Sequence, residues 1–504
     1  MTFTPRYTNL AVLLDDAVAK FASKPLFGTR KPHGWEWTTY GEFGKLVDAA
    51  RAGLVSLGVQ RGDRVAAISN NRLEWAVCAY ATFSCGAVYV PMYEAQLDKD
   101  WQFILRDAGA KLCLCATGAI SGRVRAMQHE LPDLRHVIDF SDASYTQMLE
   151  QGRRAPVAKQ PAGDREHAMY IYTSGTTGNP KGVELTHLNL AGDISGVLEV
   201  MPLSNDERSL AFLPWAHVFG GCVELNSLIC NGGSLAICDN TDRLIEYLPE
   251  TQPTLLFAVP RIWNRIYDGV QKQIAGRPKV IQSIFHAGMR AKTKLKQGQT
   301  PTLSERIALA LAEKLIFSKV RMRFGGKLKF AFSGAAALSR DVAEFIDNLG
   351  ITVCEGYGLT ESTGCTTAST PTARRLGAVG KAIPGVTIKL DHNVTGAAEG
   401  EGEILIYGVG VMGGYHNLPG ETSATITADG GLRSGDLGRI DADGFLYITG
   451  RVKELYKLSN GKYVAPAALE EKLTLSPYVA QCLVYGSDKP HNVALIVPDM
   501  ASLA

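Results

Sequence analysis

Apolar positions along the chain alternate between two spacings. Short continuous apolar runs, typical of buried strands, alternate with stretches in which apolar residues recur at helical intervals. In chain order the segments are RVAAISNN, a helix around LEWAVCAYATF, AVYVPM, a helix over residues 101–107, and AKLCLCAT. Strands that alternate with helices predict parallel sheets with helices on their faces, so we expect an α/β fold built from βαβ layers.

Two segments in the N-terminal part refine this expectation. Thr39 and Glu42 have the spacing of a capping box, which predicts a helix beginning near Tyr40. Residues 75–93 carry no charge, but they include Thr82, Ser84, Gly86 and Pro91. We therefore expect a buried helix that ends near residue 86 and a following strand, rather than a membrane span.

The pattern changes twice in the C-terminal part of the chain. From residue 377 it consists of short strands and glycine-rich turns, such as GEILIYG and FLYITG. After residue 450 it changes to a strand, a turn, a helix over residues 466–475 and the strand QCLVYG. We predict a large N-terminal domain (1–450), closed by a β-rich subdomain at about 377–450, and then a small α+β domain (451–504). At about 50 residues this last unit is short for an independent domain, so we expect it to be incomplete.

Composition is that of an ordinary globular protein. Of the 504 residues, 46% are hydrophobic and 20% are charged, and the net charge of +2 does not favour nucleic acid as a partner. The ten cysteines include no CxxC pair, and alternation puts Cys113 and Cys115 on one face of a strand. The N-terminal segment MTFTPRYTNLAVLLDD lacks the features of a secretory signal. We expect buried, reduced thiols in a cytoplasmic protein, with metal or redox use of the cysteines as the alternative.

The segment YTSGTTGNPKGV, residues 172–183, has the composition of an anion-binding loop. It follows an apolar run and precedes a helical stretch, and it offers backbone N–H groups and hydroxyls to an anion. A P-loop does not fit, because Gly175 and Gly178 are only three residues apart and Lys181 is followed by glycine. A plain polar surface loop is the other alternative. Lys181 can add a cation to the expected phosphate-binding residues, which are Thr173, Ser174, Gly175, Thr176, Thr177 and Gly178.

This segment resembles the phosphate-binding loop of the adenylate-forming superfamily, which includes acyl-CoA synthetases, firefly-type luciferases and peptide-synthetase adenylation domains. The resemblance extends in order over essentially the whole chain. The upstream stretch GVQRGDRVAAISNN is similar to the first core motif of that superfamily. The later motifs are LPWAHVFG (213–220), FSGAAALS (332–339), EGYGLTES (355–362), SGDLG (434–438) and GRVKELYKLSNGKYVAP (450–466).

The resemblance implies a nucleotide site built from these motifs. Glu361, with the hydroxyl of Thr173, would hold Mg²⁺ on the phosphates through the oxygen ligands that this ion prefers; a solvated loop carboxylate is the alternative. Tyr357 would stack on adenine unless it is a core tyrosine, and Thr360 would hydrogen-bond the α-phosphate. Further nucleotide contacts would come from Gly334, Ala335, Glu355, Gly356 and Gly358.

Three residues near the end of the large domain extend the implied site. Asp436 follows a Ser-Gly turn and can accept both ribose hydroxyls, unless it is an ordinary turn aspartate. By resemblance, Arg451 would hold ribose and phosphate oxygens. Lys453 matches the hinge between the large and small domains, where a surface lysine is the alternative.

The motif around His217 is the implied acyl site. His217 is similar to the residue at which the acyl carboxylate meets the phosphate, with a structural histidine as the alternative. Trp215 and Phe219 flank it and are expected to help line an acyl tunnel. The resemblance thus implies a catalytic set of Lys181, Thr173, Glu361, His217 and Arg451.

Some segments point to one branch of the superfamily. KLIFSKVRMRFGGKLKFAFSGAAALS and VPRIWNRIYDGV resemble long-chain acyl-CoA synthetases more than activators of acetate, aryl acids or amino acids. The implied reaction uses ATP and Mg²⁺ to convert a medium- or long-chain fatty acid to acyl-AMP and then transfers the acyl group to coenzyme A. Two alternatives stay open: an acyl-AMP ligase that loads a carrier-protein thiol, and a truncated, non-catalytic acyl- or nucleotide-binding protein. The second arises because the superfamily's adenylation lysine does not appear before Ala504.

Residues 290–329 form a strongly basic segment. They hold eleven Lys or Arg against two acids, a surplus of nine, so the rest of the chain carries −7 within a total of +2. Our hypothesis is that this segment forms one face that meets anionic lipid, as a peripheral membrane contact, or the phosphates of coenzyme A. The alternative is a set of solvated helix faces whose charges point in several directions. The sequence leaves the oligomeric state open.

A second glycine pattern is a false signal. Gly408, Gly410 and Gly413 fit GxGxxG after the strand EILIY. A dinucleotide site requires a helix directly afterwards, and Pro419 and Gly420 are expected to break any helix here. We therefore expect no dinucleotide site.

Overall fold

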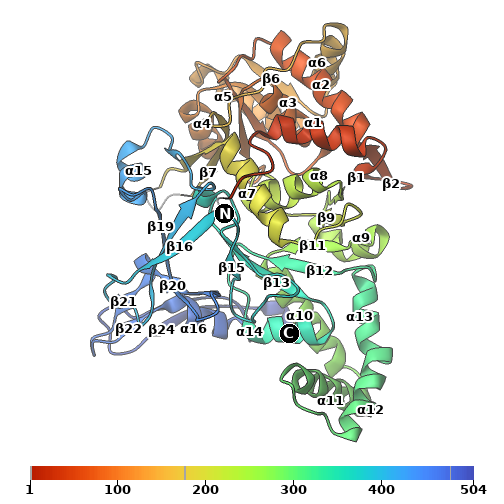
Figure 1. Ribbon diagram of the computed structural model, residues 1–504, viewed down its shortest axis with the longest axis vertical. Helices are drawn as coiled ribbons and strands as arrows, with labels where there is room; N and C mark the ends of the chain where they lie inside the picture. Colours follow the sequence, from red (N-terminus) through yellow and green to blue (C-terminus); the bar gives the residue numbers. More distant parts are fainter. Residues whose placement is uncertain (1–2, 175–177, 477, 504) are drawn as a thin grey trace.

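Two large sheets make up most of the molecule, a computed structural model that describes residues 3–174, 178–476 and 478–503 (Figure 1). Within these residues the first sheet consists of β3 (Arg64–Ile68), β4 (Val88–Met92), β5 (Ala110–Cys115), β6 (His136–Asp139), β7 (His167–Thr173), β8 (Lys181–Thr186) and β18 (Gly414–Tyr415). Their order across the sheet is β18-β8-β7-β4-β3-β5-β6. The strands β3 to β7 pair in parallel, while β8 and β18 add antiparallel pairs at one edge.

Helices alternate with these strands, as the hydrophobic pattern predicted. Thr39 and Glu42 form the expected capping box at the start of the helix near Tyr40. The uncharged stretch is a buried helix followed by a strand, and no helix in the described part of the chain could cross a bilayer. The helices are α1 (Leu10–Phe21), α2 (Tyr40–Ser56), α3 (Leu73–Ser84), α4 (Asp98–Asp107), α5 (Gly118–Met127), η1 (Gln128–Glu130), α6 (Ala143–Arg154) and α7 (His187–Val200).

The second sheet has antiparallel pairs at both edges and parallel pairs in its centre. Its strands within the described residues are β1 (Pro25–Lys31), β2 (Gly34–Thr39), β9 (Arg208–Ala211), β10 (Ser234–Ile237), β11 (Leu255–Ala258), β12 (Phe330–Ser333), β13 (Val353–Tyr357), β14 (Thr367–Ala368) and β15 (Lys381–Ala382). They are ordered β15-β14-β13-β12-β11-β9-β10-β1-β2. The accompanying helices are the π-helix η2 (Phe219–Asn226), α8 (Ser227–Asn231), η3 (Thr241–Arg243), α9 (Leu244–Thr251), α14 (Arg340–Asn348) and η5 (Thr360–Ser362).

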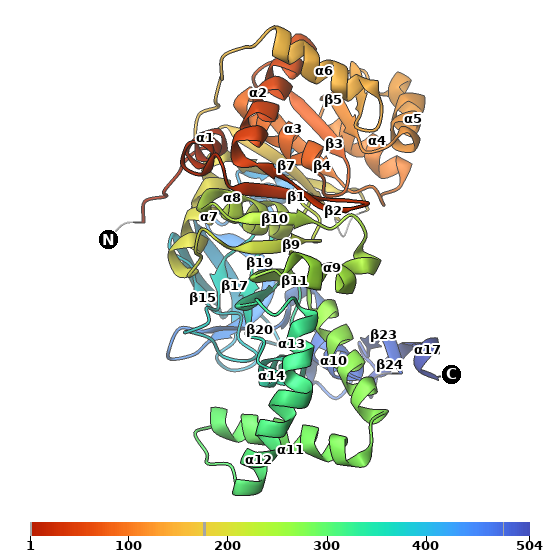
Figure 2. The same ribbon diagram turned by 90° about the vertical axis from the view of Figure 1, so that its right-hand side faces the viewer.

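A long helical insertion connects two neighbouring strands of the second sheet. It leaves after β11 and returns to β12, and in Figure 2 it extends to the lower end of the molecule. Its helices are α10 (Pro260–Ala275), α11 (Lys279–Lys296), α12 (Leu303–Ala312), the π-helix η4 (Glu313–Phe317) and α13 (Ser318–Arg323).

The C-terminal part contains the short strands that the sequence predicted. A four-stranded antiparallel sheet, ordered β16-β17-β19-β20, consists of β16 (Val386–Asp391), β17 (Gly402–Gly408), β19 (Leu432–Ile440) and β20 (Leu446–Arg451). The predicted helix after residue 465 and the strand QCLVYG are both confirmed. The domain boundaries stay predictions. The elements beyond β20 are η6 (Val452–Glu454), β21 (Tyr456–Lys457), β22 (Tyr463–Val464), α16 (Pro466–Leu473), β23 (Val479–Tyr485), β24 (Val493–Pro498) and α17 (Met500–Leu503).

The glycine pattern formed by Gly408, Gly410 and Gly413 lacks the helix that a dinucleotide site requires, but not for the reason that the sequence predicted. The strand β17 ends at Gly408, and the next regular element is the short strand β18, so no helix follows the glycines directly. The expectation that Pro419 breaks a helix is wrong: Pro419 is the first residue of α15 (Pro419–Thr425). Proline is favoured there because the first turn of a helix leaves its N–H groups unpaired.

The cysteines lie where the alternation placed them. All ten are free, nine are buried, and the Sγ atoms of Cys113 and Cys115 are 3.8 Å apart on one face of β5. Burial raises the pKa of the Cys78 and Cys354 thiols, Cys354 to about 12. The Cys78 and Cys354 thiols are therefore protonated near neutral pH and pack as small apolar groups.

Candidate functional site

The ends of the anion-binding loop are held by the antiparallel pair β7 and β8. Thr173 and Lys181 are direct partners in this pairing, so the two strands bring the hydroxyl and the ammonium to one edge of the sheet. Gly178 has a φ of 105°, a conformation that glycine adopts without strain, and Ser174 is the last described residue on the other side. The remaining loop residues, Gly175, Thr176 and Thr177, lie outside the described residues.

Lys181 lies in a polar cluster built from distant parts of the chain. Its Nζ is 2.6 Å from a carboxylate oxygen of Glu421 and 5.2 Å from the ring centre of Tyr415. The Tyr415 hydroxyl donates a 2.7 Å hydrogen bond to Glu361. Tyr415 thus contacts both Lys181 and Glu361, and it pairs with β8, whose first residue, Lys181, is the strand partner of Thr173. We call Lys181, Glu361, Tyr415 and Glu421 the loop cluster.

Sequence reasoning missed Tyr415 and Glu421. Both belong to GYHNLPGE, a segment whose Pro and Gly predict only a break in any helix. Glu421 is 240 residues away from Lys181 along the chain, and its position on α15 depends on β18 joining the edge of the first sheet. The hydrogen bond from Lys181 and its charge lower the pKa of Glu421, and Lys453 adds to this effect.

A second polar cluster joins Tyr357, Asp436 and Arg451. The Tyr357 hydroxyl donates a 2.8 Å hydrogen bond to one Asp436 oxygen, and Arg451 Nε donates a 3.0 Å hydrogen bond to the other. Asp436 and Arg451 are partners in the pairing of β19 with β20, which fixes their relative position. Burial raises the pKa of Asp436 against the opposing effect of these two donors. We call these three residues the aspartate cluster.

Backbone segments of the second sheet lie next to the aspartate cluster. Glu355, Gly356 and Tyr357 are the last residues of β13, and Thr360 is buried in η5 just beyond Gly358. Gly334 follows β12, and Ala335 has a φ of 67°, which strains a residue with a β-carbon. Glu355 is buried and accepts a 3.4 Å hydrogen bond from the Gly377 N–H.

An apolar cavity opens beside these segments. It has an empty volume of about 630 Å³, part of which is open to solvent. Phe257 and Phe332, whose rings stack at 4.9 Å, lie on its wall together with Val197 of α7 and the following Met201 and Leu203. The lining also includes His217, Gly334, Ala335, Gly356, Tyr357 and Gly358, which belong to the motifs expected to bind a nucleotide and the acyl carboxylate.

Two of the three residues expected at an acyl site line this cavity, and one lies elsewhere. His217 and Phe219 belong to the lining, and the His217 Nδ1 accepts a 3.2 Å hydrogen bond from the Phe219 N–H. Burial lowers the pKa of His217, so the imidazole is neutral near neutral pH.

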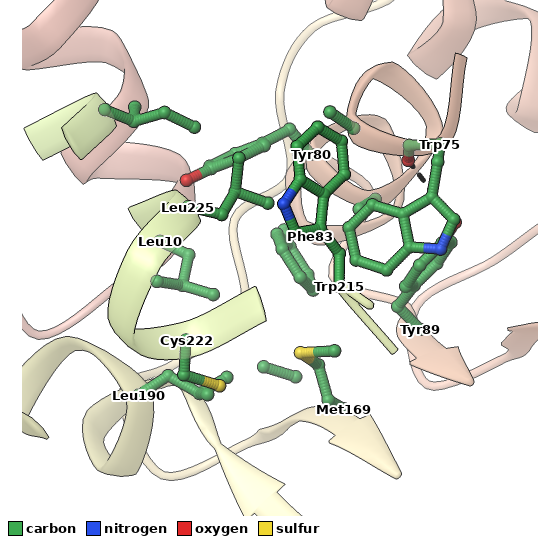
Figure 3. Packing of buried hydrophobic residues seen from close by; sticks show 14 of the residues in the cluster. Leu10, Trp75, Tyr80, Phe83, Tyr89, Met169, Leu190, Trp215, Cys222 and Leu225 are labelled. Carbon is green, nitrogen blue, oxygen red and sulfur yellow. Dashed lines mark hydrogen bonds between the residues drawn. The ribbon is translucent and has the colours of Figure 1, made fainter. Parts of the chain in front are cut away.

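Trp215 lies in the hydrophobic core instead. Figure 3 shows its ring beside Trp75 and Tyr80, and the ring centres of Trp75 and Trp215 are 5.7 Å apart. Asn71 fixes this segment by accepting a hydrogen bond from the Trp215 N–H at 2.8 Å. The expectation that Trp215 lines the tunnel therefore has no support from its position, since only 1% of the residue is exposed.

The loop cluster has the chemistry of a magnesium site but not of a transition-metal site. No group of three His, Cys, Asp or Glu ligands occurs among the described residues. Mg²⁺ is usually bound by one or two carboxylates together with substrate phosphates and waters. Glu361 supplies one carboxylate, and Thr173 supplies a hydroxyl on the neighbouring strand, so the donors fit Mg²⁺ when a phosphate is present.

The sequence matches two family models that together span most of the chain. Residues 14–416 match the model described as AMP-binding enzyme, and residues 454–503 match the AMP-binding enzyme C-terminal domain. A long-chain-fatty-acid–CoA ligase, FadD15 of Mycobacterium tuberculosis, is 33% identical over 92% of this chain and 78% of its own length. The peroxisomal long chain acyl-CoA synthetase 6 of Arabidopsis thaliana is 30% identical over 98% of this chain and 74% of its own length.

Solved structures share the fold. ATP-bound MatB from Rhodopseudomonas palustris superposes with a TM-score of 0.77 at 25% identity, covering 98% of this chain and 89% of that one. The anthranilate CoA ligase AuaEII with anthranoyl-AMP gives a TM-score of 0.78 at 20% identity, covering 99% and 88%. The α/β architecture with a small C-terminal unit, expected from the sequence, is therefore confirmed.

Proposed function

Because this chain belongs to the AMP-binding enzyme family, we propose that it activates a medium- or long-chain fatty acid with ATP and transfers the acyl group to coenzyme A. One observation carries this proposal above the others: a largely apolar cavity is lined in part by residues expected to bind a nucleotide. A fatty acid could lie in the cavity with its carboxylate at the polar end, beside His217. The names of the relatives support the same substrate class.

In the first half-reaction a carboxylate oxygen attacks the α-phosphorus of ATP, and pyrophosphate leaves. Both reactants are anions, so the protein must align them and neutralise their charge. We assign this work to Lys181, Arg451 and the loop N–H groups. Lys181 would exchange Glu421 for a phosphate oxygen, an exchange favoured by the exposure of Glu421, whose side chain is 42% exposed. Mg²⁺, held by Glu361 and Thr173, would supply further positive charge at the phosphates.

The aspartate cluster would bind the nucleoside. Asp436 is held in place by two donors, and in the bound state ribose hydroxyls would donate to it as well. Tyr357 lies on the cavity wall, where its ring offers a flat face to adenine. His217 is neutral and can hydrogen-bond the acyl carboxylate without forming a competing ion pair.

In the second half-reaction the sulfur of coenzyme A bonds to the acyl carbon. The bond from that carbon to the phosphate oxygen breaks, AMP leaves, and the thiol proton passes to solvent. This step needs no nucleophile from the protein. We assign the hinge between the two steps to Lys453, which lies in η6 directly after β20. A cytoplasmic location with peripheral membrane contact belongs to the same proposal.

The proposal is tested by separating the two half-reactions. We expect pyrophosphate release with dodecanoate and ATP, and an acyl-CoA product when coenzyme A is added, both detected by mass spectrometry. Each CH₂ buried in the cavity should contribute up to about 0.8 kcal/mol, so affinity should rise about fourfold per CH₂ until the cavity is full. Higher activity with acetate or benzoate than with dodecanoate would refute the substrate class. Adenylate without acyl-CoA, but with transfer to a carrier-protein thiol, would support the carrier-protein ligase instead.

A further inference from the structure

The helical insertion presents an uncovered apolar surface. Leu303, Ile307, Leu311 and Leu315 recur every four residues along α12 and η4, a spacing that places them on one side of the helix. All four are exposed, Leu303 by 74% and Ile307 by 55%. The opposite side of this helical stretch packs on α11, where Ala312 of α12 and Phe317 of η4 are fully buried. We call the four exposed residues the apolar stripe. Soluble proteins rarely leave such a row exposed without a use for it.

Basic side chains flank the apolar stripe. Of the eleven basic residues in 290–329, four are bound to acids of the fold: Lys294 to Glu305, Lys296 to Asp347, Arg321 to Glu313 and Lys329 to Glu207. Within the described part of the chain, no salt-bridge partner is found for Arg290, Lys292, Arg306, Lys314, Lys319, Arg323 and Lys327. Arg306 and Lys314 lie three residues after Leu303 and Leu311, which makes them neighbours of the apolar stripe on α12. The charges therefore do not all cancel within the fold, and a cationic apolar face remains.

We propose that this face docks on an anionic lipid bilayer. An interfacial helix buries an apolar row in the headgroup region and places Lys and Arg beside it, where they meet anionic lipids. A nucleic acid would leave the leucines in water, and a protein partner would not need a surplus of cations. The choice of a lipid surface also rests on the proposed function, since a long-chain fatty acid is dissolved in membranes.

The insertion is attached directly to the walls of the acyl cavity. It leaves the second sheet after β11 and rejoins it at β12. These strands carry Phe257 and Phe332, the stacked rings on the cavity wall. Docking at the apolar stripe would therefore hold the cavity-bearing sheet at the membrane from which the substrate is taken.

The cationic part is tested by vesicle co-sedimentation of the full chain without ATP. We expect binding to phosphatidylglycerol–phosphatidylcholine vesicles that weakens as salt is raised from about 0.05 M to about 0.5 M. The variant Arg306→Glu/Lys314→Glu/Lys319→Glu should bind about tenfold or more weakly. The matched control Lys45→Glu/Lys99→Glu/Arg135→Glu changes the net charge equally at exposed positions elsewhere and should keep most of the affinity. Equal losses in both variants, or no loss in the first, would overturn the proposal.

The apolar part is tested by Leu303→Ser/Ile307→Ser. This variant should bind anionic vesicles about tenfold more weakly at high salt as well as at low salt, whereas Ile245→Ser, an equally exposed site on α9, should bind normally. A melting temperature close to that of the wild type shows that a variant folds. If the Glu substitutions at Arg306, Lys314 and Lys319 prevent folding, Gln substitutions at the same three positions are used instead. Sedimentation velocity without lipid tests whether the face binds a second copy of the chain instead. A wild-type dimer that dissociates in the Leu303→Ser/Ile307→Ser variant would show this and would overturn the lipid proposal.

Failure of this inference and failure of the proposed function give different results. Vesicle binding is measured without ATP or fatty acid, so it can occur in a protein that lacks ligase activity. Conversely, with hexanoate supplied in solution and no vesicles, the Arg306→Glu/Lys314→Glu/Lys319→Glu variant should keep wild-type kcat. It should lose activity only when a long-chain acid is supplied within vesicles. Equal activity of the variant and the wild type on vesicle-borne acid would contradict the role of the face in substrate collection.

Discussion

Asp436 and Glu421 hold the two cations of the site in opposite ways. Asp436 belongs to β19, its side chain is 6% exposed, and it accepts hydrogen bonds from both Tyr357 and Arg451. Glu421 belongs to the short helix α15, its side chain is 42% exposed, and it receives one hydrogen bond from Lys181. Burial raises the pKa of the first carboxyl, and a neighbouring cation lowers the pKa of the second. The difference indicates that Asp436 is a fixed part of the site and that Glu421 is exchangeable.

The comparison is tested most strongly by Asp436→Ala. This substitution removes the acceptor of two donors and the expected partner of the ribose. Hydrogen bonds to charged groups contribute about 1.5–3 kcal/mol each, so AMP and ATP should bind roughly 10–150-fold more weakly in calorimetry. Asp429→Ala, which removes an exposed carboxylate from the turn before β19, serves as the control and should bind normally. Unchanged affinity of Asp436→Ala would mean that the buried carboxylate is only structural.

Glu421→Gln should have a smaller effect in the opposite direction. Removing the negative charge frees Lys181 for the phosphates, so ATP should bind about two- to fivefold more tightly at low salt, the range of exposed ion pairs. The gain should disappear at about 1 M salt, where charges are screened within about 3 Å. Weaker ATP binding by this variant would show that Glu421 positions Lys181 rather than competing for it.

The smallest effect is a difference in pH dependence. The pKa of Asp436 in the folded state lies above its ordinary value of 3.8, so the folded protein binds more protons and stability falls as the pH rises through that window. The pKa of Glu421 lies below its ordinary value of 4.5, so this group adds stability above 4.5 that is lost as the pH falls. In urea unfolding across the acid range, Asp436→Asn should therefore remove a negative slope and Glu421→Gln a positive one. Equal slopes would mean that the two environments do not differ.

Much of this arrangement could be predicted from the sequence because it is local. The strand β3, the helix α3 and the capping box of α2 each follow from spacing within a dozen residues. Five motif residues lie in the two clusters, namely Lys181, Glu361, Tyr357, Asp436 and Arg451, and Thr173 is the strand partner of Lys181. Each could be named from the sequence because its motif is a short continuous stretch.

Other features could not be predicted because they depend on contacts between distant segments. The contact of Glu421 with Lys181 spans 240 residues and requires β18 to join the first sheet. In LPWAHVFG, large apolar residues occupy both a position that faces the core and a position that faces the cavity. The sequence pattern therefore could not show that Trp215 packs in the core and that Phe219 lines the cavity. The basic residues of 290–329 could be counted from the sequence, but the sequence could not show which of them have acidic partners. Only the folded insertion shows that Lys294 and Lys296 are bound to acids.

The pairing of Thr173 with Lys181 also sets a limit for protein engineering. Side chains alternate between the faces of a sheet, so a single residue inserted within β8 between Lys181 and Val183, the partner of Tyr415, would turn the lysine away from Tyr415 and Glu421. Libraries that vary length are therefore better directed at the turn after α11, which lies far from both clusters in the sequence. Within the paired segment, the number of residues between Lys181 and the strand partner of Tyr415 must stay constant.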